Sequence, residues 1–154
     1  MSDPTITTAR LALQERLQSI RIANGYRVTV AAVRWSREAR VGDTRDDFPV
    51  INLFSLDERR AGDAIGNVQQ QIQDWERTVQ LEATLLADDE YEDQWDALLD
   101  DIRRALSLPI APAPLNGAAL DLTIRSLEFN APAAGSQYAA LRMQLALSYR
   151  ITLE

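Results

Sequence analysis

Residues 136–154 read SQYAALRMQLALSYRITLE and contain the most regular pattern in the chain. From residue 141 onward, apolar residues hold every odd position, and mostly polar residues hold the even ones. Successive side chains leave a pleated strand on opposite sides, so this alternation predicts one long strand with one face against a core. The other face is free to line a channel or to meet a neighbouring subunit. Its polar members are Arg142, Gln144, Ser148 and Arg150.

The segment before this strand predicts a second strand and a turn. In LNGAALDLTIRSLEF, residues 115–129, the apolar residues lie on one parity up to Ile124 and on the other parity from Leu127. Such a change of parity indicates a β-bulge, which we place near Arg125 and Ser126. NAPAAGS, residues 130–136, then reads as the turn between the two strands.

Two further strands are predicted in the first half of the chain. YRVTVAAVRWS, residues 26–36, is rich in β-branched and aromatic residues, and FPVINLFSL, residues 48–56, follows with its proline near the beginning. The charged stretch REARVGDTRDD, residues 37–47, separates them, and DERRAGDAIGN, residues 57–67, reads as another polar connection. The two strands are therefore joined by a long charged loop and not by a tight turn.

The segment from Val68 to Ala87 allows two interpretations. Val68, Ile72, Trp75 and Val79 recur at helical spacing, whereas apolar and polar residues alternate strictly over residues 78–85. Threonine and valine are poor choices for a helix because their branched side chains lose rotamer freedom there. We therefore predict a strand over the later half of this segment.

Two helices complete the set of elements. Asp3 and Pro4 are typical of a helix start, and Asn24-Gly25 of a helix end, which predicts a helix from about Thr5 to Ala23. DDEYEDQWDALLDDIRRALSL, residues 88–108, combines carboxylates at its start with an apolar stripe and arginines in its last turn. We therefore expect one α+β domain over residues 1–154, a largely antiparallel sheet of about five strands with two α-helices packed on one face.

The composition excludes several kinds of chemistry. The chain has no histidine and no cysteine, and all 16 basic residues are arginine. A histidine base, a thiolate nucleophile or metal site, and a Schiff-base lysine are therefore ruled out. The net charge of -7 also argues against a protein that grips nucleic acid by its phosphates. We expect no enzyme activity and no cofactor.

Two polar stretches are candidates for contacts between subunits. The charged loop could be a plain surface loop or an arm whose mixed charges match a neighbour, and the sequence leaves both interpretations open. Its candidate residues are Arg37, Arg40, Asp43, Arg45, Asp46 and Asp47. A polar run at Gln69, Gln70 and Gln71 is the second candidate, and it could equally consist of ordinary polar strand residues.

The acidic start of the second helix could be a metal site or a solvated helix face. Its carboxylates are those of Asp88, Asp89, Glu90, Glu92, Asp93, Asp96, Asp100 and Asp101. A carboxylate-only site for Mg²⁺ would make the chain a small hydrolase. Because the carboxylates point in several directions around a helix and lack the spacing of a calcium loop, a solvated helix face is the favoured interpretation.

The order of these segments resembles the tail terminator proteins of long-tailed bacteriophages. The likeness rests on NGYRVTV, on FPVINLF, on WERTVQLEATL, on DALLDDIRRAL and on the final YRITLE, and it covers nearly the whole chain. It is a likeness in the order and character of elements more than in any single signature. Membership of this family would imply a small α+β subunit that assembles as a hexameric ring.

The resemblance also implies partners and a place of action. Such a ring caps the tail tube, ends its polymerisation and presents a surface for the head connector, while genomic DNA passes through the lumen without specific binding. The protein would be assembled in the cytoplasm of the host bacterium and reside in the tail or neck of the virion. The sequence has no apolar run long enough to span a membrane and no signal-like N-terminus, so we expect no membrane partner. The alternatives are a neck or head-completion protein, another adaptor of the particle, and the metal hydrolase.

Overall fold

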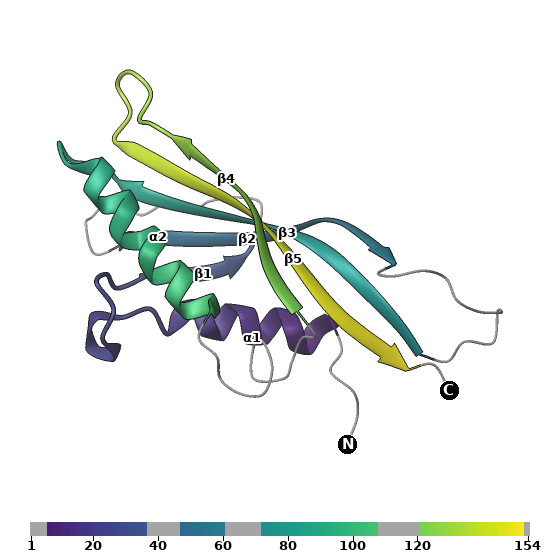
Figure 1. Cartoon of the computed structure of the whole chain (residues 1–154). Helices are drawn as coiled ribbons and strands as arrows, with labels where there is room; N and C mark the ends of the chain where they lie inside the picture. The colour runs from purple at the N-terminus through teal and green to yellow at the C-terminus, as the bar shows by residue number, and fades with distance from the viewer. Residues whose placement is uncertain (1–5, 37–46, 61–71, 108–120, 153–154) are drawn as a thin grey trace.

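The computed structural model describes residues 6–36, 47–60, 72–107 and 121–152, and Figure 1 shows the elements that they form. In chain order these are α1 (Ile6–Gln18), the 3-10 turn η1 (Ile22–Asn24), β1 (Ala32–Trp35), β2 (Val50–Arg60), β3 (Ile72–Leu86), α2 (Tyr91–Ser107), β4 (Asp121–Asn130) and β5 (Tyr138–Thr152). The α+β class expected from the sequence is confirmed.

The described strands form one five-stranded sheet in the order β1-β2-β3-β5-β4. β1 runs parallel to β2, and every other neighbouring pair is antiparallel. β3 and β5 have 15 residues each and pair over their whole length, from Ile72 opposite Thr152 to Leu86 opposite Tyr138. The long strand predicted at the end of the chain is therefore a central strand of the sheet, with β3 and β4 on either side.

Both α-helices of the described chain pack on the same face of the sheet. The odd positions of β5 point toward this face, and from Leu141 to Leu147 they have no exposed surface. They belong to one apolar cluster with side chains of both helices, among which Leu13, Leu17, Leu98 and Ile102 are the largest fully buried ones. We call this the inner face, and we call the opposite face, which carries the even positions of β5, the outer face.

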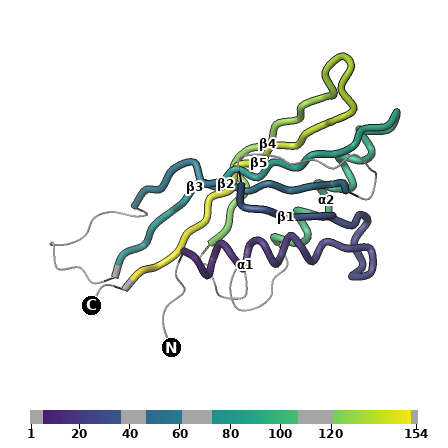
Figure 2. The backbone as a smooth tube through the Cα atoms, turned by 180° about the vertical axis from the view of Figure 1, so that it is seen from behind, coloured from purple at the N-terminus to yellow at the C-terminus, as the bar shows by residue number. Residues whose placement is uncertain are grey.

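The long strands extend beyond the helices. Figure 2, seen from behind, shows β3 and β5 continuing past α1 toward the end where the chain terminates.

The two helices are joined by the buried Arg16 of α1, whose Nη1 donates a hydrogen bond to the carbonyl oxygen of Ala105 at 3.0 Å. Ala105 lies near the C-terminal end of α2, where the helix dipole favours a cation.

The first helix ends earlier than predicted. α1 stops at Gln18 and not at Ala23, because the hydroxyl of Ser19 donates to the carbonyl oxygen of Arg16 at 2.6 Å. A serine side chain that bonds to the backbone in this way competes with continued helix. Gly25, with φ of 90°, ends η1 instead of the helix.

The strand predicted over residues 26–36 is also shorter, because β1 covers only Ala32–Trp35. The backbone N–H groups of Arg27 and Val28 both donate to the carboxylate of Asp101 on α2, each at 2.8 Å. These donors are used by a tertiary contact, so this part of the chain does not pair within the sheet.

The second strand continues further than predicted. β2 runs to Arg60, so the first four residues of DERRAGDAIGN are strand and not connection. A bulge between Ser55 and Asp57 shifts the register, after which Glu58 lies opposite Arg77 and Arg59 opposite Glu76. Opposite charges on facing strands stabilise such a pairing, which explains why a charged segment stays in the sheet.

Three other predictions about local structure are confirmed. Residues 78–85 are strand, within β3. β4 has its register shift between Ile124 and Ser126, at the position where the change of parity placed a bulge. The acidic helix is present as α2, Tyr91–Ser107.

Candidate assembly surfaces

The four polar residues singled out on the last strand share the outer face of the sheet. Arg142, Gln144 and Arg150 are exposed, and Ser148 is half-buried. The even positions of β3 lie beside them in register, with Glu82 opposite Arg142 and Gln80 opposite Gln144. No described helix packs on this face, so it is a broad polar surface with strand geometry.

Arginines cover carboxylates on this outer face. The side chains of Arg59, Arg125, Arg142 and Arg150 are 45–68% exposed, whereas those of their partners Glu76, Glu82 and Asp74 are 14–36% exposed. The carboxylates come from β3, and the arginines come from β2, β4 and β5. The outermost layer of this surface is therefore made of guanidinium groups, which suit planar contacts with carboxylates or aromatic rings.

Glu76 is the centre of this arrangement. It accepts from Arg59 at 2.9 Å and from Arg125 at 3.0 Å, so one carboxylate of β3 is shared by arginines from β2 and β4. Glu76, Arg59 and Arg125 were not among the residues predicted from the sequence. The charged residues at even positions of β3 were visible in the sequence, but their partners depend on strand order and register.

The end of the outer face holds a second pair, between Asp74 and Arg150. Arg150 Nε and Nη2 donate to the two oxygens of Asp74 at 2.8 and 3.2 Å. The hydrogen bonds from Arg150 lower the pKa of Asp74, against a smaller opposing effect of burial. The ionised form of Asp74 is therefore favoured in the folded protein.

Asp74→Asn is expected to give a stability difference that depends on pH. Because the folded pKa lies below the unfolded value, the ionised carboxylate stabilises the fold above the unfolded pKa of about 3.9, and the effect is lost as the pH falls through the folded pKa. At pH 7 the wild type should melt about 1–3 °C higher than the variant, because partly exposed pairs contribute little. Thermal melts from pH 7 to pH 2 measure this. Asp57→Asn, at an exposed carboxylate of β2, is the control, and a pH-independent difference for Asp74→Asn would contradict the assignment.

A partly buried polar group joins three strands on the inner face. Tyr149 Oη of β5 donates to Glu58 Oε1 of β2, and Arg77 Nε of β3 donates to the same oxygen at 3.1 Å. Burial, followed by the hydrogen bond to Glu58, raises the pKa of Tyr149 to about 12. Tyr149 was read from the sequence as a core residue. Its ring is indeed buried, but the partner of its hydroxyl depends on the bulge in β2.

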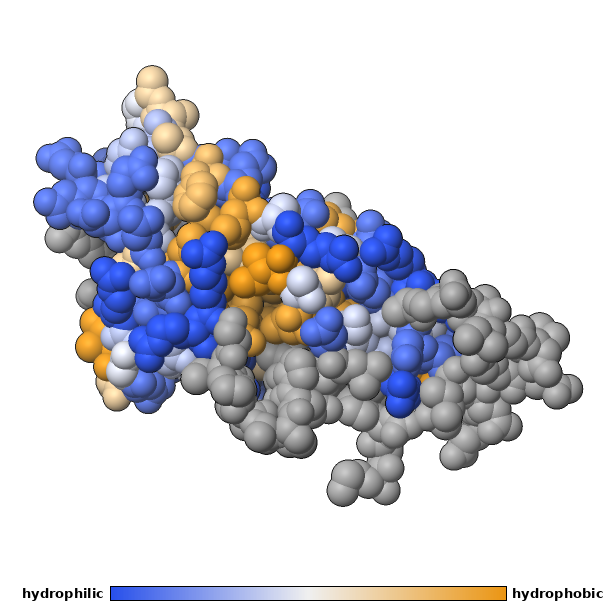
Figure 3. Space-filling view, viewed as in Figure 1, coloured by the Kyte–Doolittle hydropathy of each residue, from blue (hydrophilic) through white to orange (hydrophobic). Residues whose placement is uncertain are grey.

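The two edges of the sheet differ. Along β1, Gln14 Nε2 donates to the Val33 carbonyl oxygen at 3.0 Å and Trp35 Nε1 to the Arg10 carbonyl oxygen at 3.3 Å, so α1 covers this edge. Along β4 every residue is exposed or half-buried, including the 46% exposed Phe129. β4 is therefore the open edge among the described strands. Figure 3 shows apolar side chains along the middle of the face that carries α2, with hydrophilic side chains on both sides.

Most of the remaining candidates lie outside the described residues. Among the charged loop, only Asp47 is described, and it is half-buried. The candidates outside the described ranges are Arg37, Arg40, Asp43, Arg45, Asp46, Gln69, Gln70 and Gln71. Their role in subunit contacts stays a prediction.

The acidic helix divides into two parts in the structure. In residues 72–107, as in the other described ranges, no group of three or more carboxylates is arranged to hold a metal ion. The carboxylates from Asp88 to Asp96 are exposed, and Asp88 accepts from the backbone N–H of Glu90 at 2.7 Å. Asp101 was grouped with the surface carboxylates, and this was wrong, because Asp101 is fully buried. It acts as an acceptor for the segment before β1.

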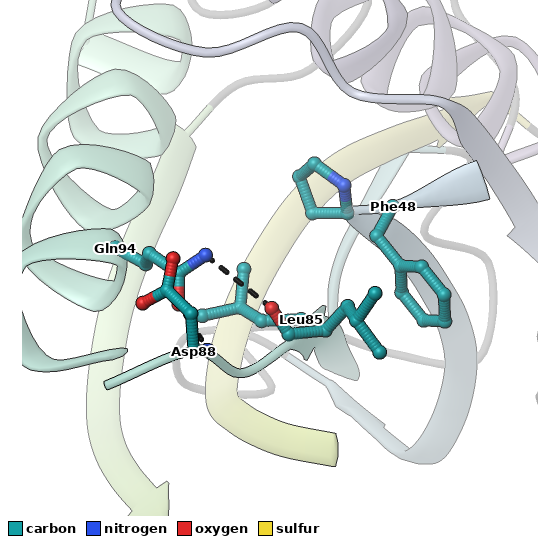
Figure 4. Close-up of a pocket in the computed structure, with 6 residues that line it drawn as sticks. Phe48, Leu85, Asp88 and Gln94 are labelled. Atoms are coloured by element: carbon teal, nitrogen blue, oxygen red, sulfur yellow. Dashed lines mark hydrogen bonds between the residues drawn. The ribbon is translucent and has the colours of Figure 1, made fainter. Parts of the chain in front are cut away.

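A small pocket lies where β3 ends and α2 begins. Its volume is about 160 Å³, and it is lined by Phe48, Pro49, Leu85, Leu86, Asp88 and Gln94. Gln94 donates to the Leu86 carbonyl oxygen at 3.3 Å and accepts from the Asp88 N–H at 3.4 Å, as Figure 4 shows. The walls are apolar and the rim is polar. Sequence reasoning missed this pocket, because its lining comes from three separate segments.

No protein-family model matches the chain, and no curated protein matches it.

Proposed function

We propose that this chain is a structural subunit of a bacteriophage tail that forms a ring on the tail tube, ends tube polymerisation and offers the surface for joining the head. The starting point is the resemblance of the sequence to tail terminator proteins. The observed order of helices and strands agrees with the α+β subunit that this resemblance implies. We propose a hexamer as its assembled form.

The proposal rests mainly on the long pair β3 and β5, whose outer face is not covered by either of the described helices. A 15-residue strand is far longer than the usual strand of about five or six residues. The outer face is polar, and its β3 and β5 residues pair in register. Exposed arginine side chains form its outermost layer. A surface of this kind, rigid and rich in arginine, suits contacts with neighbouring subunits or with the tube.

The proposed partners are other copies of the chain, the tail tube protein and the proteins of the head connector or neck. Genomic DNA would pass through the lumen without specific binding, which agrees with the net charge of -7. None of the described helices is long and apolar enough to cross a membrane. We place the protein in the tail or neck of the virion, after assembly in the bacterial cytoplasm.

The chain is expected to stop the growth of tail tubes. Tube protein from the same phage would be polymerised with increasing amounts of the chain, and tube lengths would be measured by negative-stain electron microscopy. Mean length should fall as the ratio of chain to tube protein rises, because a cap at the growing end blocks further addition. Light scattering on the isolated chain, across concentration and salt, should show a species near six subunits.

The control is the order of addition. Chain added after the tubes are complete should leave their length unchanged but give extra density at one end of each tube. Tubes that grow to full length in the presence of the chain, with bare ends, would contradict capping. Binding to the head connector in the absence of tube binding would support the neck adaptor instead.

A further inference from the structure

The turn around η1 carries an isoleucine whose side chain is exposed to solvent. Ile22 is 64% exposed, more than any other large apolar residue that the structure describes. Its N–H donates to Thr29 Oγ1 at 3.0 Å, and its carbonyl oxygen accepts from the Gly25 N–H at 3.0 Å. Asn24 Nδ2 donates to the Ser19 carbonyl oxygen at 2.9 Å. The backbone of the turn is thus fixed on both sides of Ile22, so the point from which its side chain extends is defined.

Two exposed arginines without an ion pair among the described residues lie next to Ile22 in the chain or at the end of α2 that the turn contacts. Arg21 and Arg103 are both exposed, and within the described part of the chain neither forms an ion pair. Arg104, in the last turn of α2, donates to the Gly25 carbonyl oxygen at 3.3 Å and stacks over the Tyr26 ring at 5.0 Å. The turn is therefore attached to the C-terminal end of α2. Arg21 directly precedes Ile22 in the turn, and Arg103 directly precedes Arg104 on α2.

The pocket at the other end of α2 has the opposite charge at its rim. Asp88 lines the pocket, and Asp89 and Glu90 follow it at the surface. Among the described residues, no carboxylate from Asp88 to Asp96 forms an ion pair. The 17 residues of α2 separate the two ends by about 25 Å. One end of α2 therefore has an apolar knob with free arginines, and the other has an apolar pocket with free carboxylates.

The pocket has room for one aliphatic side chain. Its volume is about 160 Å³, and apolar cavities of about 150 Å³ are large enough to hold a benzene molecule. Phe48, Leu85 and Leu86 provide apolar walls. An isoleucine that leaves water for this pocket would be stabilised by the hydrophobic effect.

We propose that the Ile22 turn of one copy docks into the Phe48–Leu86 pocket of the next copy, with Arg21 and Arg103 facing the carboxylates of Asp88 to Glu90. Knob and pocket are different surfaces of the same chain, so the contact is head-to-tail and generates a ring when the rotation closes. The inference rests on the proposed ring, and it assigns that ring a specific contact. It places the subunit interface at the two ends of α2.

Cysteine trapping tests the contact directly, because the chain has no cysteine of its own. Ile22→Cys and Leu86→Cys proteins, one carrying a small tag, would be mixed in equal amounts and oxidised. The tagged heterodimer should dominate on a non-reducing gel. The control mixes Leu11→Cys with Leu86→Cys, because Leu11 on α1 is similarly exposed at 54%. Equal heterodimer yields in the two mixtures would overturn the proposal.

A second pair of variants measures affinity without cross-linking. Ile22→Glu should weaken self-association by at least about tenfold, as expected for an apolar anchor, while Leu11→Glu should change it less than about twofold. Light scattering over a concentration series gives both values. Equal effects of the two variants, or a wild type that stays monomeric at the highest concentration, would overturn the docking. A hexamer whose Ile22→Cys and Leu86→Cys forms do not link would also overturn it but would support the ring, so the two proposals fail separately.

Discussion

Leu145→Ala is expected to lower the free energy of unfolding by about 3–4 kcal/mol, in the middle of the usual range of about 2–5 kcal/mol for a leucine shortened to alanine in a packed core. Leu145 is fully buried, and it lies opposite Val79 of β3 and Ile124 of β4. Shortening it leaves a cavity in the central strand, which the neighbouring strands cannot close without breaking their pairing. Urea unfolding followed by circular dichroism measures the change.

The matched control is the next residue along the strand. Gln144 is exposed and lies between Gln80 and Ser126 on the outer face. Gln144→Ala should change the free energy of unfolding by less than about 0.5 kcal/mol, as is usual at a surface position. Similar losses for the two variants would mean that β5 does not have one buried and one open face.

Asp101→Ala is expected to destabilise the protein by about 3 kcal/mol. Asp101 has no exposed surface, and its Oδ2 accepts the N–H groups of Arg27 and Val28, each at 2.8 Å. The substitution leaves two backbone donors without their acceptor, and each such group costs about 1–3 kcal/mol. Urea unfolding should show a lower midpoint with an unchanged slope.

Two variants distinguish the loss of this backbone contact from the loss of a surface charge. Asp100→Ala removes the neighbouring carboxylate, which is exposed and pairs with Arg27 at 3.2 Å, so the loss should stay below about 1 kcal/mol. Asp101→Asn keeps an oxygen that can accept the two N–H groups, and it should therefore cost less than Asp101→Ala. If Asp100→Ala were as damaging as Asp101→Ala, the backbone contact would not be the cause.

The residues of the candidate surfaces differ in how far they could be predicted. Arg142, Gln144 and Arg150 were identified because alternation along one strand determines which residues share a face. Glu76 was missed, because it became the centre of an ion-pair group only when β2 and β4 took their places in the sheet. The pocket was missed for the same reason, since its walls come from the two residues before β2, the end of β3 and the residues around the start of α2.

Helix and strand boundaries show where competing contacts intervene. The helix predicted to reach Ala23 ends at Gln18 because a serine hydroxyl takes a backbone carbonyl. The strand predicted from Tyr26 begins only at Ala32 because a carboxylate on α2 takes two of its backbone donors. In both cases the residue types suited the predicted element, but a different partner satisfied the backbone.

The sequence by itself determined the class of the fold, the identity of the long strand and the side of it that faces the core. These properties depend on the spacing of apolar residues along a single segment, and burial of that pattern is the dominant favourable term in folding. Only the tertiary structure decided the strand order, the register, the burial of Asp101 and the placing of a pocket and an exposed isoleucine at opposite ends of α2. These properties arise between segments distant in the chain, where the choice of partner depends on how all the elements pack together.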